Sequence, residues 1–174
     1  MPPRVAFVSA EATRPLRHLV LRAGQSFETT RYAEDHEPGV AHVAVFVDEG
    51  PMPDGIVTIA SGFPEPVRAL PEGTALTAIP EVDRVSAYRL RGMATHPDYR
   101  GHGLGRLAFE VIRQYAADAG AGVLWFNART GAQAFYERLG CHVASPVFDI
   151  EGIGPHVVMW CETGDAGRRD ATHG

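Results

Sequence analysis

The stretch from Arg89 to Gly105 constrains the fold more than any other part of the chain. A strand-like segment, Arg89 to Thr95, leads through His-Pro-Asp-Tyr into Arg100-Gly-His-Gly-Leu-Gly105, and an amphipathic segment follows. Glycines at alternate positions leave amides uncrowded at the start of a helix, where N–H groups lack intrahelical acceptors and the dipole favours negative charge. This strand, turn and helix therefore predict a cradle for an anion, most often a phosphate.

Two common phosphate-binding motifs do not fit this stretch. Gly103-x-Gly105-x-x-Ala108 matches a loose dinucleotide fingerprint, but no acidic residue ends the next predicted strand, where Trp125-Phe-Asn127 stands instead. A P-loop needs a lysine after its last glycine, and all 16 basic residues of this chain are arginines. The lack of lysine also excludes a Schiff-base mechanism on the protein side.

Composition limits the class of protein. The 174 residues, 45% of them hydrophobic, suit one globular domain. A net charge of −5 argues against a nucleic-acid partner. No apolar run is long enough for a signal peptide or a membrane span, and Cys141 and Cys161 form no CxxC pair, so we expect a cytoplasmic protein with reduced, buried thiols, without a membrane partner. A symmetric homodimer is left open.

Periodicity predicts a series of strands and helices with two irregular segments. The expected strands are 4–9, 42–47, 56–61, 89–95, 123–126, 142–150 and 156–161, and the expected helices are 13–21, 104–119 and 131–139. The helix 104–119 would place on one apolar stripe Leu104, Leu107, Ala108, Val111, Ile112, Tyr115 and Ala116. Residues 22–40 are polar, residues 62–86 form a proline-rich insertion, and residues 163–174 read as a disordered tail.

Three motifs resemble those of the GNAT superfamily of N-acetyltransferases over residues 4 to 162. They are Arg100-x-x-Gly103-x-Gly105, then Asn127-Ala-Arg through Phe135-Tyr-Glu-Arg-Leu-Gly140, and Gly152-Ile-Gly-Pro-His-Val-Val-Met159. The third is similar to a signature of the ElaA-like branch. The resemblance implies a single α/β (α+β) domain, residues 1–162, with a mixed, mostly antiparallel central sheet flanked by helices.

The resemblance also implies an activity and a set of site residues. The chain would transfer an acetyl group from acetyl-CoA to a primary amine of a small molecule, by direct attack in a ternary complex. The residues that would bind acetyl-CoA are Met93, Ala94, Thr95, Arg100, Gly101, His102, Gly103, Leu104, Gly105, Arg106 and Asn127. Met93 would lie at the thioester carbonyl, and Tyr136 would protonate the leaving thiolate, because a phenol is protonated at neutral pH.

The general base and the acceptor pocket are less constrained. Many family members carry a glutamate on the central strand, but residues 85–97 contain no carboxylate here. His156, Glu151, Glu28 or a chain of water molecules are the alternatives for the base. Segments 22–40, 62–86 and 151–156 are candidates for the acceptor pocket, with Gln25, Glu28 and Glu151 as substrate contacts.

Two other functions stay open at this point. One is acetylation of protein N-termini or peptides. The other is a non-catalytic acyl-CoA sensor, which the missing strand carboxylate favours. The chain has no HxH or HExxH pattern and no cluster of carboxylates, so we expect no metal site.

Overall fold

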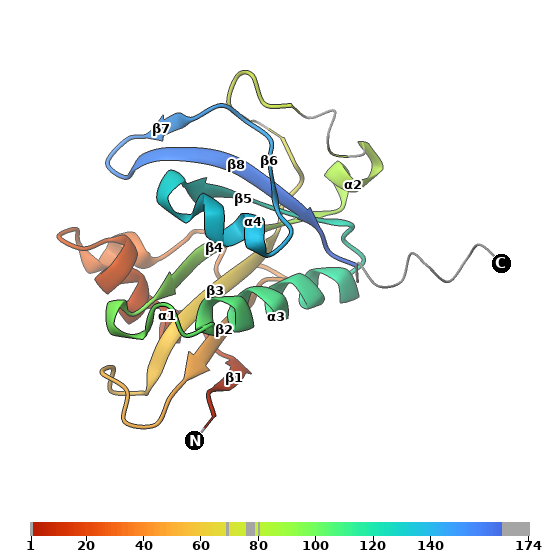
Figure 1. Ribbon diagram of the computed structural model, residues 1–174. Coiled ribbons are helices and arrows are strands. Elements are labelled where there is room, and N and C mark those ends of the chain that lie inside the picture. Colours follow the sequence, from red (N-terminus) through yellow and green to blue (C-terminus); the bar gives the residue numbers. More distant parts are fainter. Residues whose placement is uncertain (1, 69, 76–78, 80, 165–174) are drawn as a thin grey trace. The chain divides into compact units, whose positions relative to one another are not determined.

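The computed structural model describes residues 2–68, 70–75, 79 and 81–164. The chain divides into two compact units. Figure 1 labels their helices and strands. The first unit contains Met1–Pro64 and Arg89–Tyr115, and the second contains Glu65–Tyr88 and Ala116–Gly174.

The first unit is built on four strands. They are β1 (Arg4–Phe7), β2 (Ala41–Phe46), β3 (Ile56–Pro64) and β4 (Ala87–Thr95), and they lie in the order β1-β2-β3-β4. The β1–β2 and β2–β3 pairs are antiparallel, with a register shift between Val45 and Phe46. The helical elements are α1 (Ala10–Leu16), the π-helix η1 (Arg17–Leu21), the 3₁₀ turns η2 (Phe27–Thr30) and η4 (Pro97–Tyr99), and α3 (Leu104–Asp118).

The first helix changes its hydrogen-bond pattern halfway. Ser9 caps α1 by accepting a hydrogen bond from the amide of Ala12 at 3.3 Å, and Leu16 packs in a core cluster with residues of β2, β3 and β4. The helix predicted over residues 13–21 is present, but it begins earlier, at Ala10, and it continues from Arg17 onward as a π-helical turn. That turn buries Arg17 completely and leaves Leu19 exposed.

The strands of the second unit form antiparallel pairs. The elements of this unit are α2 (Glu81–Val85), β5 (Val123–Arg129), the 3₁₀ turn η5 (Thr130–Ala132), α4 (Gln133–Arg138), β6 (His142–Val143), β7 (Phe148–Ile150) and β8 (Gly154–Glu162). β8 pairs with β5, β6 and β7, in each case antiparallel. The predicted α/β class, with a mostly antiparallel sheet flanked by helices, is confirmed.

The strand expected over residues 142–150 is interrupted. Pro146 has no N–H to donate to a neighbouring strand, which breaks the pairing at this point. The hydroxyl of Ser145 accepts a hydrogen bond from the amide of Val158 at 2.8 Å and so replaces the missing strand contact.

The proline-rich insertion belongs to the two units rather than forming a free loop. Its first residues, 62–64, extend β3. Further along, the indole of Trp125 donates to the carbonyl of Glu65 at 2.9 Å, and Val67 and Ile79 join a core cluster of the second unit. At the other end of the chain, the amide of Thr163 donates to the carbonyl of Gly122 at 3.1 Å, so Thr163 is part of the folded unit. The rest of the expected tail, residues 165–174, lies outside the described residues.

The predicted stripe of α3 is largely confirmed, since Leu104, Ala108, Ile112 and Ala116 are buried, but it is wrong at Leu107 and it missed Phe109. Phe109 is fully buried, whereas Leu107 is 39% exposed. Ala108, Ile112 and Ala116 are also fully buried. With about 100° per residue, these positions form one arc with Phe109, and Leu107 falls on the opposite side.

Truncation of Leu107 and of Phe109 tests which of the two side chains is buried, the one predicted from the sequence or the one buried in the structure. Phe109→Ala should lower the free energy of unfolding by about 3–5 kcal/mol, because it leaves a cavity. Leu107→Ala on the same helix should cost less than about 1 kcal/mol. Urea denaturation of both variants measures the difference; equal losses would show that the stripe read from the sequence was the correct one.

Candidate active site

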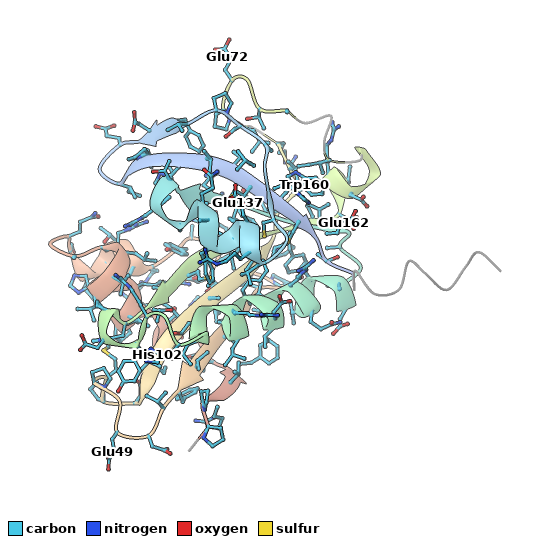
Figure 2. All side chains as sticks on the ribbon, in the orientation of Figure 1. Glu49, Glu72, His102, Glu137, Trp160 and Glu162 are labelled. Carbon is cyan, nitrogen blue, oxygen red and sulfur yellow. The ribbon has the colours of Figure 1, made fainter. Side chains whose placement is uncertain are left out.

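The loop between β4 and α3 depends on two glycines in the left-handed region. Gly101 has φ of +79° and Gly103 has φ of +76°. A Cβ at either position would meet no atom within 4 Å, so backbone conformation rather than crowding requires glycine there. Their amides consequently border open space. The adjacent His102 is labelled in Figure 2.

Hydrogen bonds to both neighbouring strands hold this loop in place. The amide of His96 donates to the carbonyl of Val57 at 2.8 Å, and Nε of Arg100 donates to the carbonyl of Thr95 at 3.3 Å. Nδ1 of His102 lies 2.9 Å from the carbonyl of Arg100, which can only accept, so Nδ1 carries the hydrogen.

The N-terminus of α3 presents amide groups to the space beside this loop. The amide of Leu107 donates to the carbonyl of Gly103 at 3.2 Å, as the first hydrogen bond of α3. The amides of residues 104–106 therefore precede the first amide that donates within the helix. These amides and the positive end of the helix dipole are the groups on which the anion cradle predicted from the sequence would depend.

β4 contains an irregular residue next to its predicted ligand-binding segment. Gly92 has φ of +62° inside the strand, the conformation of a bulge that needs glycine. A Cβ there would lie 3.1 Å from Nε of Arg17 and 3.2 Å from Cε2 of Tyr32. The bulge immediately precedes Met93, Ala94 and Thr95. Ala94 is buried in the first unit, and the hydroxyl of Thr95 lies 3.0 Å from that of Thr58.

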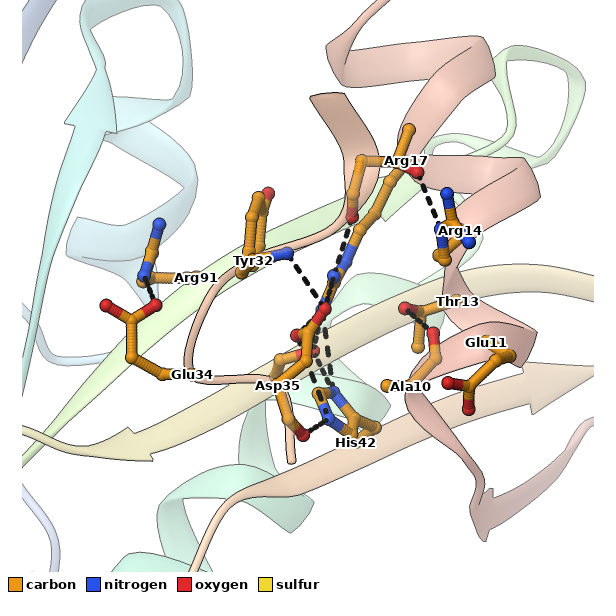
Figure 3. A network of polar contacts seen from close by, with 12 residues as sticks. Ala10, Glu11, Thr13, Arg14, Arg17, Tyr32, Glu34, Asp35, His42 and Arg91 are labelled. Carbon is orange, nitrogen blue, oxygen red and sulfur yellow. Dashed lines mark hydrogen bonds and ion pairs between the residues drawn. The ribbon is translucent and has the colours of Figure 1, made fainter. Parts of the chain in front are cut away.

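A buried polar network lies under this bulge (Figure 3). Arg17, with no exposed surface, makes two hydrogen bonds to the carboxylate of Asp35, at 2.8 and 3.0 Å. It also donates to the carbonyl of Thr30 at 2.9 Å and to the hydroxyl of Ser61 at 3.0 Å. Its guanidinium carbon lies 4.0 Å from the centre of the Tyr32 ring. The network thus fixes the side chain against which Gly92 packs.

His42 completes the network as a neutral ring. Its Nε2 lies 2.9 Å from the carbonyl of Asp35 and therefore donates, while Nδ1 accepts from the hydroxyl of Ser61 at 2.8 Å. Burial lowers the pKa of His42, although its hydrogen bond to Asp35 works in the opposite direction. Burial also raises the pKa of the Asp35 carboxyl, but the hydrogen bonds from Arg17 and Tyr32 outweigh it, and the net shift is downward.

Tyr136 lies on α4 in the second unit, in an aromatic environment. Its ring centre is 4.4 Å from that of Phe126 and 5.0 Å from that of Phe135. Burial raises the pKa of the Tyr136 hydroxyl well above its ordinary value, and the nearby Cys141 adds to the shift. The phenol therefore stays protonated throughout the neutral pH range.

Asn127 and His156 occupy paired strands of the second unit. Asn127 lies within β5 rather than at its end, because the strand continues to Arg129. Its Oδ1 is buried and accepts no hydrogen bond from any described residue. His156 is buried on β8, and its Nδ1 donates to the carbonyl of Gly154 at 2.7 Å, which leaves the lone pair of the neutral ring on Nε2.

The expected acceptor residues are exposed and fall in both units. Gln25 and Glu28 belong to the first unit, where Glu28 pairs with Arg14 at 3.3 Å. Glu151 belongs to the second unit, in the turn between β7 and β8. The anion cradle and residues 93–95 also belong to the first unit, whereas Asn127, Tyr136 and His156 belong to the second.

Several residues of the network were not predicted from the sequence. The hydrogen bonds of Arg17 join it to partners 13 to 44 positions away along the chain, so no local sequence pattern predicts them. The usable signal was a charged residue, Arg17, at a position of the predicted helix that adjoins the apolar stripe.

Among the described residues, no helix is long and apolar enough to cross a membrane. Nor do three His, Cys, Asp or Glu side chains of the described part gather as metal ligands.

Sequence comparisons give two matches that cover the loop and α3. The sequence model of the Acetyltransferase (GNAT) family matches residues 72–141. The uncharacterised N-acetyltransferase YitI of Bacillus subtilis (strain 168) is 36% identical over 156 residues, which are 90% of this chain and 93% of YitI.

Structural comparisons give similar folds at low identity. An aminoglycoside 6'-N-acetyltransferase in complex with coenzyme A is 13% identical with a TM-score of 0.65, covering 93% of this chain and 98% of its own. The ribosomal-protein-S18-alanine N-acetyltransferase of Escherichia coli is 17% identical with a TM-score of 0.64, covering 97% and 98%. Escherichia coli ElaA is 14% identical with a TM-score of 0.58, covering 91% and 99%. At these identities the likeness concerns the fold.

His42 should make stability depend on pH. Because its pKa is lowered from 6.5 in the folded state, the unfolded chain takes up a proton below about pH 6.5 that the folded chain does not. The free energy of unfolding should therefore fall between pH 7 and pH 5, and His42→Gln should remove that part of the fall. Urea denaturation across this range measures both slopes. An unchanged slope in His42→Gln would contradict the assignment; the shift of Asp35 acts only below its ordinary pKa of 3.8.

Proposed function

Because the chain belongs to the Acetyltransferase (GNAT) family, we propose that it transfers the acetyl group of acetyl-CoA to the primary amine of a small molecule. Membership rests on the 36% identity to YitI over almost the whole of both chains. The observation that carries the proposal is the glycine loop with the N-terminus of α3, since both have the geometry of a site for the pyrophosphate of coenzyme A.

The first unit supplies the proposed pyrophosphate and pantetheine contacts. The amides from Gly101 to Arg106 would bind the pyrophosphate, because the two glycines leave open space beside them. The backbone of β4 at residues 93–95 would pair with the pantetheine amides. Thr95 is already oriented for this role by its hydroxyl contact with Thr58 and its carbonyl contact with Arg100.

Asn127 is the other residue that we propose for the pantetheine. Its buried Oδ1 has no partner among the described residues, and an unpartnered buried acceptor costs about 1–3 kcal/mol. A pantetheine N–H would relieve that cost. The contact fits the chemistry of the ligand, which offers amide donors.

Tyr136 would serve as the acid. Its raised pKa keeps the hydroxyl protonated. A phenol is already a weaker acid than a thiol, whose pKa is about 8.5, and the burial of Tyr136 widens this difference. Complete transfer of the proton to the thiolate is therefore unfavourable, and the phenol acts mainly by donating a hydrogen bond to the sulfur as negative charge develops there. We propose that the hydrogen bond from Tyr136 to this sulfur supplies most of the stabilisation.

His156 is the base that the geometry favours. Its Nδ1 donates to a backbone carbonyl, which orients the ring and leaves Nε2 to accept a proton from the attacking amine. Glu151, Glu28 or a chain of water molecules are the alternatives. Glu28 is the weakest of these, because it already pairs with Arg14 and Arg31.

A sensor without catalysis is the second candidate. It is favoured by one observation, the absence of a carboxylate from residues 85–97. Protein N-termini are the other acceptor class, by likeness of fold to the Escherichia coli enzyme for ribosomal protein S18. Release of free thiol from acetyl-CoA with a panel of small amines and peptides separates these functions: a sensor binds acetyl-CoA without amine-dependent release.

Gly103→Asp tests the anion cradle. The variant should lose measurable binding of acetyl-CoA, because it places a carboxylate beside the pyrophosphate. Gly120→Asp is the matched control, since Gly120 has φ of +85° and open space around it but lies at the other end of α3. Calorimetric titration measures both. Unchanged binding in Gly103→Asp would remove the loop from the site.

Tyr136→Phe tests the acid. The turnover number should fall about 100-fold or more, the usual contribution of a general acid, while the affinity for acetyl-CoA stays the same. Tyr115→Phe, which alters a ring that contacts Phe7 at 5.7 Å, should leave turnover unchanged. If Tyr136→Phe turns over at the rate of the unaltered protein, Tyr136 is a packing residue.

A further inference from the structure

Arg91 on β4 is a half-buried arginine with an unusually fixed side chain. Its guanidinium carbon lies 4.4 Å from the ring centre of Tyr32 and 5.3 Å from that of Phe63. Both rings are buried, whereas 26% of the Arg91 side chain is exposed. Stacking on two rings removes much of the side chain's rotational freedom before any ligand arrives, and the N–H groups in the plane of the guanidinium remain able to donate hydrogen bonds.

The ring that supports Arg91 is itself held from behind. Figure 3 shows Tyr32 between Arg91 and Arg17. The buried Arg17 stacks on Tyr32 at 4.0 Å, and the amide of Tyr32 donates to the carboxylate of Asp35 at 3.0 Å. The charge of Arg17 is matched by Asp35, so the two form a neutral support. The charge of Arg91 has no buried counterpart in this network.

The present partner of Arg91 is an exposed carboxylate that can exchange. Nη1 of Arg91 lies 3.2 Å from an oxygen of Glu34, whose side chain is 56% exposed. Such a surface pair contributes about 0–1 kcal/mol, and a guanidinium has five N–H donors. A carboxylate from solution could therefore replace Glu34 at little cost and form two parallel hydrogen bonds.

The position of Arg91 along β4 relates it to the proposed reaction. Arg91 precedes Met93, the proposed position of the thioester carbonyl, by two residues, which is about 7 Å along a strand. The left-handed Gly92 between them also lies against Tyr32, since a Cβ at Gly92 would be 3.2 Å from Cε2 of that ring. A ligand held by Arg91 would thus have its reacting nitrogen only a few bonds from its anionic group.

We infer that Arg91 binds the carboxylate of the acceptor, and that the acceptors of this enzyme are amino acids or similar amines with a carboxylate a few bonds from the nitrogen. This inference rests on the proposed N-acetyltransferase function. Arg91 is a specificity residue, and Glu34 occupies the carboxylate site until the acceptor displaces it.

Matched acceptors test this inference. Leucine with leucinamide, and alanine with alaninamide, differ in the carboxylate and keep the side chain. For each variant, kcat/KM for the acid is divided by kcat/KM for the amide. The two amines differ in basicity, but this difference is the same for every variant and cancels when the ratios are compared. Arg91→Gln should lower that ratio at least about tenfold, the loss expected for hydrogen bonds to a charged group. Arg91→Lys should lower it less, and Glu34→Gln should raise kcat/KM for the acids.

A binding measurement makes the test independent of turnover. Protein saturated with coenzyme A is titrated with N-acetyl-leucine and with N-acetyl-leucinamide, and the unaltered protein should bind the acid more tightly. The preference should disappear in Arg91→Gln, whose thermal unfolding and affinity for acetyl-CoA show whether it is folded. If coenzyme A binds but no carboxylate preference is seen, or if Arg91→Gln retains the preference, the inference is overturned. If neither coenzyme A nor acetyl-CoA binds, the proposed function itself fails.

Discussion

The buried ion pair between Arg17 and Asp35 is the interaction on which the first unit depends. Removing two charges from water costs several kcal/mol for each ion, and only good geometry repays it. Here both oxygens of Asp35 meet Arg17, and Thr30 and Ser61 take further donors. The pair joins the π-helical turn to the loop before β2 and to β3. The aromatic ring above it and the bulge of β4 therefore share one fixed support.

Local patterns predicted most of the fold and failed where distant partners decide. The strand, loop and helix around Gly103 were recognisable because glycine positions and apolar spacing act over a few residues. Leu107 was misplaced because several angular positions of α3 carry apolar side chains, and only packing selects the buried arc. The break at Pro146 was readable in principle, but the compensation by Ser145 depends on a strand 13 positions away.

The candidate site divides in the same way. The anion cradle stays a prediction, but the left-handed glycines that it would need at set spacing are present in the structure. The sequence did not predict that Arg17, Tyr32 and Asp35 would lie beside Gly92, because neither spacing nor periodicity connects these four positions. The proposed role of Tyr136 came from resemblance, whereas His156 was one of several candidates for the base. The structure adds the physical state of each: a buried, protonated phenol and a ring with its lone pair on Nε2.

The anchored loop before α3 has a consequence for how the proposed enzyme would divide its binding energy. Contacts from His96 to β3 and from Arg100 to β4 keep the loop in place, so the loop loses little conformational entropy when it binds a ligand. The pyrophosphate that it would hold is the same before, during and after the reaction. Such uniform binding lowers KM for acetyl-CoA without raising kcat, and it holds the product, coenzyme A, as tightly as acetyl-CoA. A rigid cradle of this kind favours an enzyme limited by departure of its product and sensitive to the cell's ratio of free to acetylated coenzyme.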